Sequence, residues 1–159
     1  MVQFELFAET SRDSDDLWVL VDCLITGYTS IIFMLRKVDV VFTGQPHTMT
    51  NDSHLPSHPV ALNAARHVVR VSKALLDAYA NPDMVSSIFG AYQVYAGLSR
   101  IYVEAIHEKG SQSQSHREDL ELIESFSQQV LAICSGNEDL YPFMKAINTL
   151  NECVKDRSF

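Results

Sequence analysis

The chain has little basic charge, which argues against direct contact with nucleic acid. It contains 12 lysine and arginine residues against 20 aspartate and glutamate residues, so its net charge is −8 and its isoelectric point is about 5.1. Proteins that grip nucleic-acid backbones need clustered lysine and arginine, and no dense basic run occurs here. The 47% hydrophobic and 20% charged residues are typical of a globular domain, and 159 residues can bury a sizeable core.

Cysteine is also scarce. Cys23, Cys134 and Cys153 are far apart, and each has apolar neighbours in a helical pattern. Zinc sites need closely spaced cysteine and histidine pairs, so we expect no metal site in these residues. We expect buried thiols in a reducing compartment, either the nucleus or the cytoplasm. His47, His54 and His58 share one polar loop, where their loose spacing favours solvated side chains over a metal site.

Long apolar runs are rare as well. Only residues 17–35, LWVLVDCLITGYTSIIFML, have the length of a membrane span. Asp22 lies inside this run, and a charge in mid-bilayer costs roughly 2.5–3.5 kcal/mol. The residues before it, MVQFELFAETSRD, lack the basic start and apolar core of a secretory signal. We therefore predict a buried helix of a soluble protein and no association with a membrane.

Helical periodicity is what the sequence does contain. A first helix is predicted over residues 17–42, with Ser14 as its N-cap and apolar residues on most sides, so that neighbours cover it on several sides. Residues 38–42 either continue this helix or are extended. After a polar loop at 43–59, Pro59 suits the first position of a second helix, which ends before Pro82. The second helix has a polar stripe (Asn63, Arg66, Arg70, Lys73 and Asp77) opposite an apolar one (Ala61, Ala65, Val68, Leu75 and Tyr79).

Three further helices are predicted. The third runs from about Asp83 to His107 and is buried on most of its circumference, because its polar residues form one narrow stripe. The fourth begins at a capping box formed by Ser115 and Glu118 and ends at a left-handed Gly136. The fifth begins near Pro142, with Phe143, Ile147, Leu150 and Val154 facing inward. The pattern predicts one all-α domain over residues 1–159, an antiparallel helical array of about five helices.

Catalytic motifs are missing from the sequence. It has no phosphate-binding loop and no dinucleotide fingerprint, and no nucleophile-elbow glycines surround Ser72 beside His67 and Asp77. The strongest candidates for a ligand site are aromatic. We expect these aromatic side chains to pack in the core between helices, and the alternative is that they line an apolar ligand pocket. These side chains are Trp18, Tyr28, Tyr92, Tyr95 and Tyr102.

Several segments resemble one protein family. HPVALNAARHVVRVSKALL (58–76), with its paired alanines, resembles a helix of the middle homology region in fungal zinc-binuclear-cluster transcription factors. SSIFGAYQVYAGLSRIYVEA (86–105) resembles the next helix of that all-helical regulatory region, matching at Phe89, Gly90, Tyr92, Tyr95 and Ala96. Residues 115–133 and 140–154 resemble its closing pair. The resemblance spans about residues 57–155 and more weakly 17–42, where FMLRK lacks the proline of the family's apolar–His–Arg–Pro turn.

This resemblance implies a regulatory or interaction domain that acts in transcriptional regulation without contacting DNA. The family's six-cysteine DNA-binding module is not in this sequence, so neither cofactor nor catalysis is expected. Partners would be proteins or the remainder of a larger regulator, with a small metabolite and self-association as further interactions. The domain would expose an apolar face where missing helices pack. The alternative is a stand-alone small helical enzyme or ligand-binding protein, with Tyr92, Tyr95 and Tyr102 around an apolar substrate.

Overall fold

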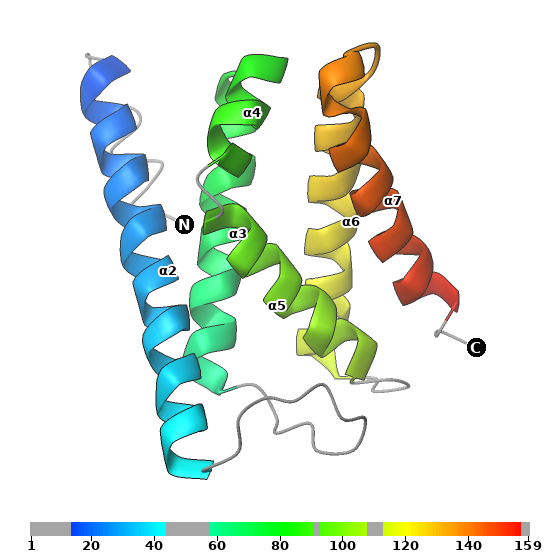
Figure 1. Cartoon of the computed structure of the whole chain (residues 1–159). Coiled ribbons are helices and arrows are strands. Elements are labelled where there is room, and N and C mark those ends of the chain that lie inside the picture. The colour runs from blue at the N-terminus through cyan, green and yellow to red at the C-terminus, as the bar shows by residue number, and fades with distance from the viewer. Residues whose placement is uncertain (1–13, 44–57, 91–92, 108–112, 157–159) are drawn as a thin grey trace.

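A computed structural model describes residues 14–43, 58–90, 93–107 and 113–156, and the all-α prediction is confirmed over these ranges, which contain no strand. Six α-helices and one 3-10 turn account for nearly all of this backbone (Figure 1). They are α2 (Ser14–Thr43), α3 (Pro59–Ala78), α4 (Pro82–Gly90), α5 (Gln93–His107), α6 (Gln114–Cys134), η1 (Glu138–Leu140) and α7 (Tyr141–Asp156).

Helices α2, α3 and α6 stand side by side, and α5 slants from α3 toward the start of α6 (Figure 1). Helices α2 and α3 run antiparallel, because Trp18 contacts Tyr79 while Tyr28 contacts His67. Helices α3 and α6 run parallel, since Arg66 pairs with Asp119 and Asp77 with Gln129 further along both helices. Helices α3 and α6 can run parallel because α4 and α5, which lie between them in the sequence, bring the chain back to the end of the bundle at which α3 begins.

The predicted third helix is two helices, which corrects the single span from Asp83 to His107. Helix α4 ends at Gly90 and α5 begins at Gln93; glycine costs about 1 kcal/mol relative to alanine inside a helix, which disfavours an unbroken span. Asn81 starts α4, because its side-chain Oδ1 accepts a hydrogen bond of 2.8 Å from the backbone N–H of Met84.

The C-terminal end of α6 matches the prediction, but its N-terminal end does not. Its N-cap is Ser113, whose Oγ accepts a 3.1 Å hydrogen bond from the His116 backbone N–H, so the predicted cap at Ser115 was wrong by two residues. Ser115 lies inside the first turn, where its hydroxyl is available for another partner. Gly136 follows the helix with φ 87°, as predicted.

Helix α3 lies at the centre of the core, in contact with α2, α5 and α6. Pro59 opens it as predicted, and Ala65, Val68, Val69 and Leu76 are completely buried. Helix α5 crosses it at Gly97, where an added Cβ would lie 3.0 Å from Val68 Cβ and 3.2 Å from the Ala65 carbonyl oxygen. The backbones of α3 and α5 can approach this closely because the residue of α5 at the crossing point is a glycine, which has no side chain.

Helix α5 is less buried than predicted. Val94, Leu98, Ile101 and Tyr102 lie in the core, but a second stripe of the helix faces outward. This exposed stripe follows from the oblique crossing, which turns one side of α5 away from both α3 and α6. Its residues are Tyr95, Ser99 and Val103.

Replacing Gly97 with alanine tests the α3–α5 crossing. The new methyl group would press on Val68 and the Ala65 carbonyl, so Gly97→Ala should lower the free energy of unfolding by about 1–3 kcal/mol. Gly27→Ala is the matched control, because an added Cβ there meets no heavy atom within 4 Å. It should stabilise the protein by about 0.5–1 kcal/mol. Urea unfolding of dilute samples measures both, and equal effects would contradict the close approach.

Candidate interaction surface

One side of α2 is exposed, contrary to the prediction that neighbours cover this helix on several sides. Only 22% of the residues from Trp18 to Leu35 are buried. Val19, Phe33 and Met34 are 64%, 48% and 58% exposed, although all three are large and apolar. We call the exposed residues of this segment the α2 outer face. They are Val19, Asp22, Cys23, Thr26, Gly27, Ser30, Phe33 and Met34.

The α2 outer face has large side chains at its ends and small ones in its middle. Val19, Cys23, Thr26, Ser30 and Phe33 follow one another at alternating intervals of four and three residues, which places them on one stripe of the helix. Helix α5 reaches the centre of this stripe, where Gln93 Nε2 donates a 3.1 Å hydrogen bond to Thr26 Oγ1, whereas a Cβ added at the neighbouring Gly27 meets no heavy atom within 4 Å. The α2 outer face is therefore bordered by α5 at Thr26 and open at Gly27.

By length and composition alone, α2 also meets the criterion for a membrane-crossing helix, over Trp18–Leu35 with mean hydropathy 1.8. Asp22 is exposed within this segment. A core helix of a water-soluble protein can pass the same test.

The inner side of α2 packs its aromatic residues on α3. The rings of Trp18 and Tyr79 are stacked with centroids 6.3 Å apart. The rings of Tyr28 and His67 are nearly parallel at 4.8 Å. Burial at this contact lowers the pKa of His67, and the nearby positive charge of Arg70 lowers it further.

Tyr95 and Tyr102 contact α6 and α7 instead. Tyr95 is 38% exposed and meets the edge of the Phe143 ring at 5.6 Å. Tyr102 is buried, and its hydroxyl donates to Asn151 Oδ1 and lies 3.1 Å from Ser127 Oγ. Burial raises the pKa of Tyr102, although the hydrogen bond with Ser127 acts in the opposite direction. Tyr92 lies outside the described residues, so the candidate aromatics that are described belong to two separate helix interfaces.

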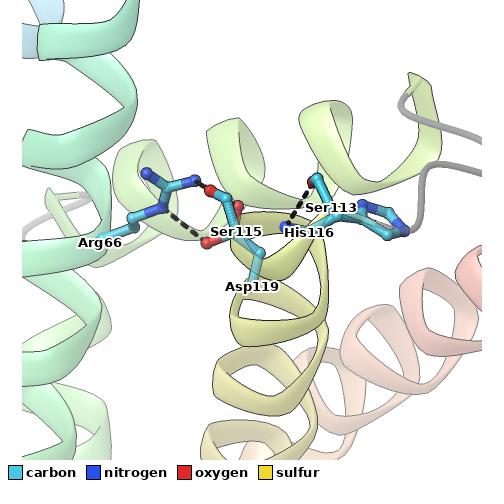
Figure 2. A network of polar contacts seen from close by, with 5 residues as sticks. All are labelled: Arg66, Ser113, Ser115, His116 and Asp119. Atoms are coloured by element: carbon cyan, nitrogen blue, oxygen red, sulfur yellow. Dashed lines mark hydrogen bonds and ion pairs between the residues drawn. The ribbon is translucent and has the colours of Figure 1, made fainter.

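A polar network joins the start of α6 to α3 (Figure 2). Arg66 Nε and Nη2 donate to the two carboxylate oxygens of Asp119 at 2.6 and 2.7 Å, and Nη2 also donates to Ser115 Oγ at 2.7 Å. The Asp119 side chain is only 4% exposed and that of Arg66 18%. A bidentate pair of this kind fixes both distance and orientation. The sequence did not reveal it, because Arg66 was assigned to a solvated stripe and Asp119 lies 53 residues away.

The other candidate residues have separate partners. His58 caps α3, with Nδ1 accepting from the Val60 backbone N–H at 3.3 Å, whereas His47 and His54 lie outside the described residues. Ser72 Oγ donates to the Val68 carbonyl oxygen, and Asp77 binds Lys73 and Gln129. Within the described ranges, no three His, Cys, Asp or Glu side chains are grouped as a metal site would need.

The cysteine prediction was right only for Cys134. All three thiols are free, but Cys23 and Cys153 are exposed. Cys134 is buried, and burial raises its pKa. Cys23 is exposed because it lies on the α2 outer face, which the sequence pattern had placed in the core.

Searches of protein-family models, of curated proteins and of solved structures found no match to this chain. A functional proposal must therefore rest on the arrangement of this chain's own residues. The α2 outer face is the surface considered first, because large apolar side chains are exposed on it.

The Arg66–Asp119 pair should matter more than the exposed pair on the same helix. Asp119→Ala leaves the Arg66 charge without its carboxylate, so the free energy of unfolding should fall by about 2–3 kcal/mol; the partial exposure of Arg66 keeps the loss below that of a fully buried pair. Lys73→Ala, which breaks the exposed contact to Asp77, should cost less than about 1 kcal/mol. Equal losses in chemical denaturation would count against a structural role for the pair.

His67 should make the fold sensitive to mild acid. Because its pKa is lowered in the folded protein, the unfolded chain takes up a proton more readily, and stability falls as the pH drops below about 6.5. His67→Phe keeps an aromatic ring against Tyr28 and removes this titration. Melting temperatures from pH 7.5 to 5.5 should therefore fall less steeply in the variant. Identical slopes would show that His67 does not contribute.

Proposed function

We propose that this chain is a helical regulatory and interaction domain that acts in transcriptional regulation through protein contacts, without binding DNA itself. The observation that carries the proposal is the α2 outer face. Exposed apolar side chains scattered singly are common on protein surfaces. Here Val19, Phe33 and Met34 share one side of one helix, which favours a protein-binding role.

The resemblance to the fungal regulatory region supports the same proposal. A domain of that kind is expected to expose an apolar face where additional helices or a partner pack. Covering Val19, Phe33 and Met34 would remove apolar area from water, which is favourable by about 25 cal/mol per Å². The proposed partners are therefore proteins or the remainder of a larger regulator, and the site of contact is α2.

The charge of the chain supports an indirect role at DNA. Its net charge of −8 would repel the phosphate backbone, so recruitment to a promoter would depend on another protein or domain. The polar contacts between α3 and α6 and between α5 and α7 suit a scaffold that presents one surface in a fixed orientation.

A reporter assay tests this proposal. The chain fused to an unrelated DNA-binding module should change transcription of a reporter several-fold relative to the module alone. Val19→Glu combined with Met34→Glu should abolish the change, because two charges on the α2 outer face prevent apolar contact.

The matched control is Ala132→Glu combined with Ala146→Glu, which adds the same charge at exposed positions of α6 and α7. This control should retain the effect of the wild-type fusion, and circular dichroism should show that both variants are folded. A fusion without any effect, or equal loss in both variants, would contradict the proposal. Tight, salt-dependent DNA binding by the isolated chain would do so as well.

A further inference from the structure

We infer that α7 is a detachable helix, which undocks from α5 and α6 as a unit by pivoting at residues 135–137. The hydrogen bond from Tyr102 to Asn151 holds it closed, and we call this bond the latch. Helix α7 lies beside α6 and also contacts α5, at the edge of the array opposite α2 (Figure 1). The inference is therefore independent of the proposed function, which concerns α2.

Helix α7 is attached through few buried side chains. Of the α7 side chains that the structure describes, at residues 141–154, Ile147 alone is buried, whereas α3 buries nine. The other α7 side chains that pack against the core are only partly buried, and they are Phe143, Met144, Leu150 and Val154. An element with few buried apolar contacts opens at a lower free energy than the core of the same protein. We therefore expect α7 to open while α3 stays folded.

The latch is a polar contact that can be exchanged without leaving an unpaired group. Tyr102 is 1% exposed and donates its hydroxyl hydrogen to Asn151 Oδ1. Ser127 Oγ, on α6, lies 3.1 Å from the same hydroxyl. When α7 leaves, Tyr102 can donate to Ser127 or to water, and Asn151 becomes hydrated. Opening therefore avoids the large penalty of a buried polar group without a partner.

The connection between α6 and α7 supplies the pivot. Gly136 has φ 87°, a conformation that glycine adopts at low cost. Hinges consist of a few loop residues that absorb large changes in φ and ψ, and Ser135 and Gly136 are exposed. Asn137 Oδ1 accepts a 3.0 Å hydrogen bond from the Asp139 backbone N–H. This local cap keeps η1 formed, so η1 moves together with α7.

Undocking changes one side of the molecule only. The stacked rings that join α2 to α3 do not involve α7, and neither does the Arg66–Asp119 pair that joins α3 to α6. Opening therefore uncovers Tyr102 and Ser127 while α2, α3 and α6 keep their arrangement. The fold thus contains a two-state element, whose populations any contact specific to one state would shift.

Hydrogen exchange of the wild-type chain provides the first test. After correction for intrinsic rates, the amides of residues 147–151 should exchange at least tenfold faster than those of residues 68–72, in the buried centre of α3. The amides of 147–151 should share one opening equilibrium, because α7 opens as a unit. A gradient of rates from the C-terminal end, with Ile147 as protected as α3, would indicate fraying alone and would overturn the inference.

Thiol labelling tests whether the surface beneath α7 is uncovered. Cys23→Ser and Cys153→Ser remove the exposed thiols, and Ser127→Cys then places a thiol beneath α7. Ser72→Cys is the matched control, because it makes the same change at an equally buried position of α3. Ser127→Cys should react with a small maleimide at least tenfold faster than Ser72→Cys, and peptide mass spectrometry distinguishes both from Cys134. Equal rates would show that this surface opens only with the core, contrary to the inference.

Asn151→Ala tests the latch. Loss of its hydrogen bond should raise the opening equilibrium of α7 roughly fivefold and leave the exchange of α3 unchanged. Asn148→Ala is the matched control, since it gives the same gain in helix propensity at an exposed position of α7. Exchange of the α7 amides should therefore be faster in Asn151→Ala than in Asn148→Ala. The same rate in both variants would exclude Asn151 as the latch and overturn the inference.

Discussion

The close approach of α5 to α3 at Gly97 sets the spacing of the other helices. Without a Cβ at that point, α5 lies against Val68 and the Ala65 carbonyl, and α3 is left free to contact α2 and α6 along its other sides. The alanines and Ser72 on α3 serve the same purpose, because small buried side chains let several helices surround one. The oblique path of α5 also turns Tyr95 and Val103 toward solvent.

Polar contacts then select one arrangement of the outer helices. The Arg66–Asp119 pair fixes the start of α6 against α3, and the Tyr102 hydroxyl joins α5 to Ser127 and Asn151. Apolar packing tolerates small shifts in register, whereas a buried polar group that loses its partner costs more than the contact contributes. These contacts therefore specify direction and register more than they add stability.

The two sides of α2 have different roles. Its inner side stacks Trp18 and Tyr28 on α3, while its outer face presents Val19, Phe33 and Met34 to solvent. Apolar residues occur on most sides of this helix in the sequence, so the pattern predicted that neighbours cover it on several sides. Among the described helices, none covers the large apolar side chains of the α2 outer face, which is why this surface supports the proposed interaction role.

The sequence by itself determined the helices and most of their ends: Pro59 starts α3, Gly136 follows α6, and Phe143, Ile147, Leu150 and Val154 face the core. These features follow from local backbone preferences and from the period of apolar residues. Only the tertiary structure decided that Asp119 is buried against Arg66, that α3 and α6 run parallel, and that Cys23 and Gly27 are exposed. Each depends on which distant segments meet, and no spacing within one segment contains that information.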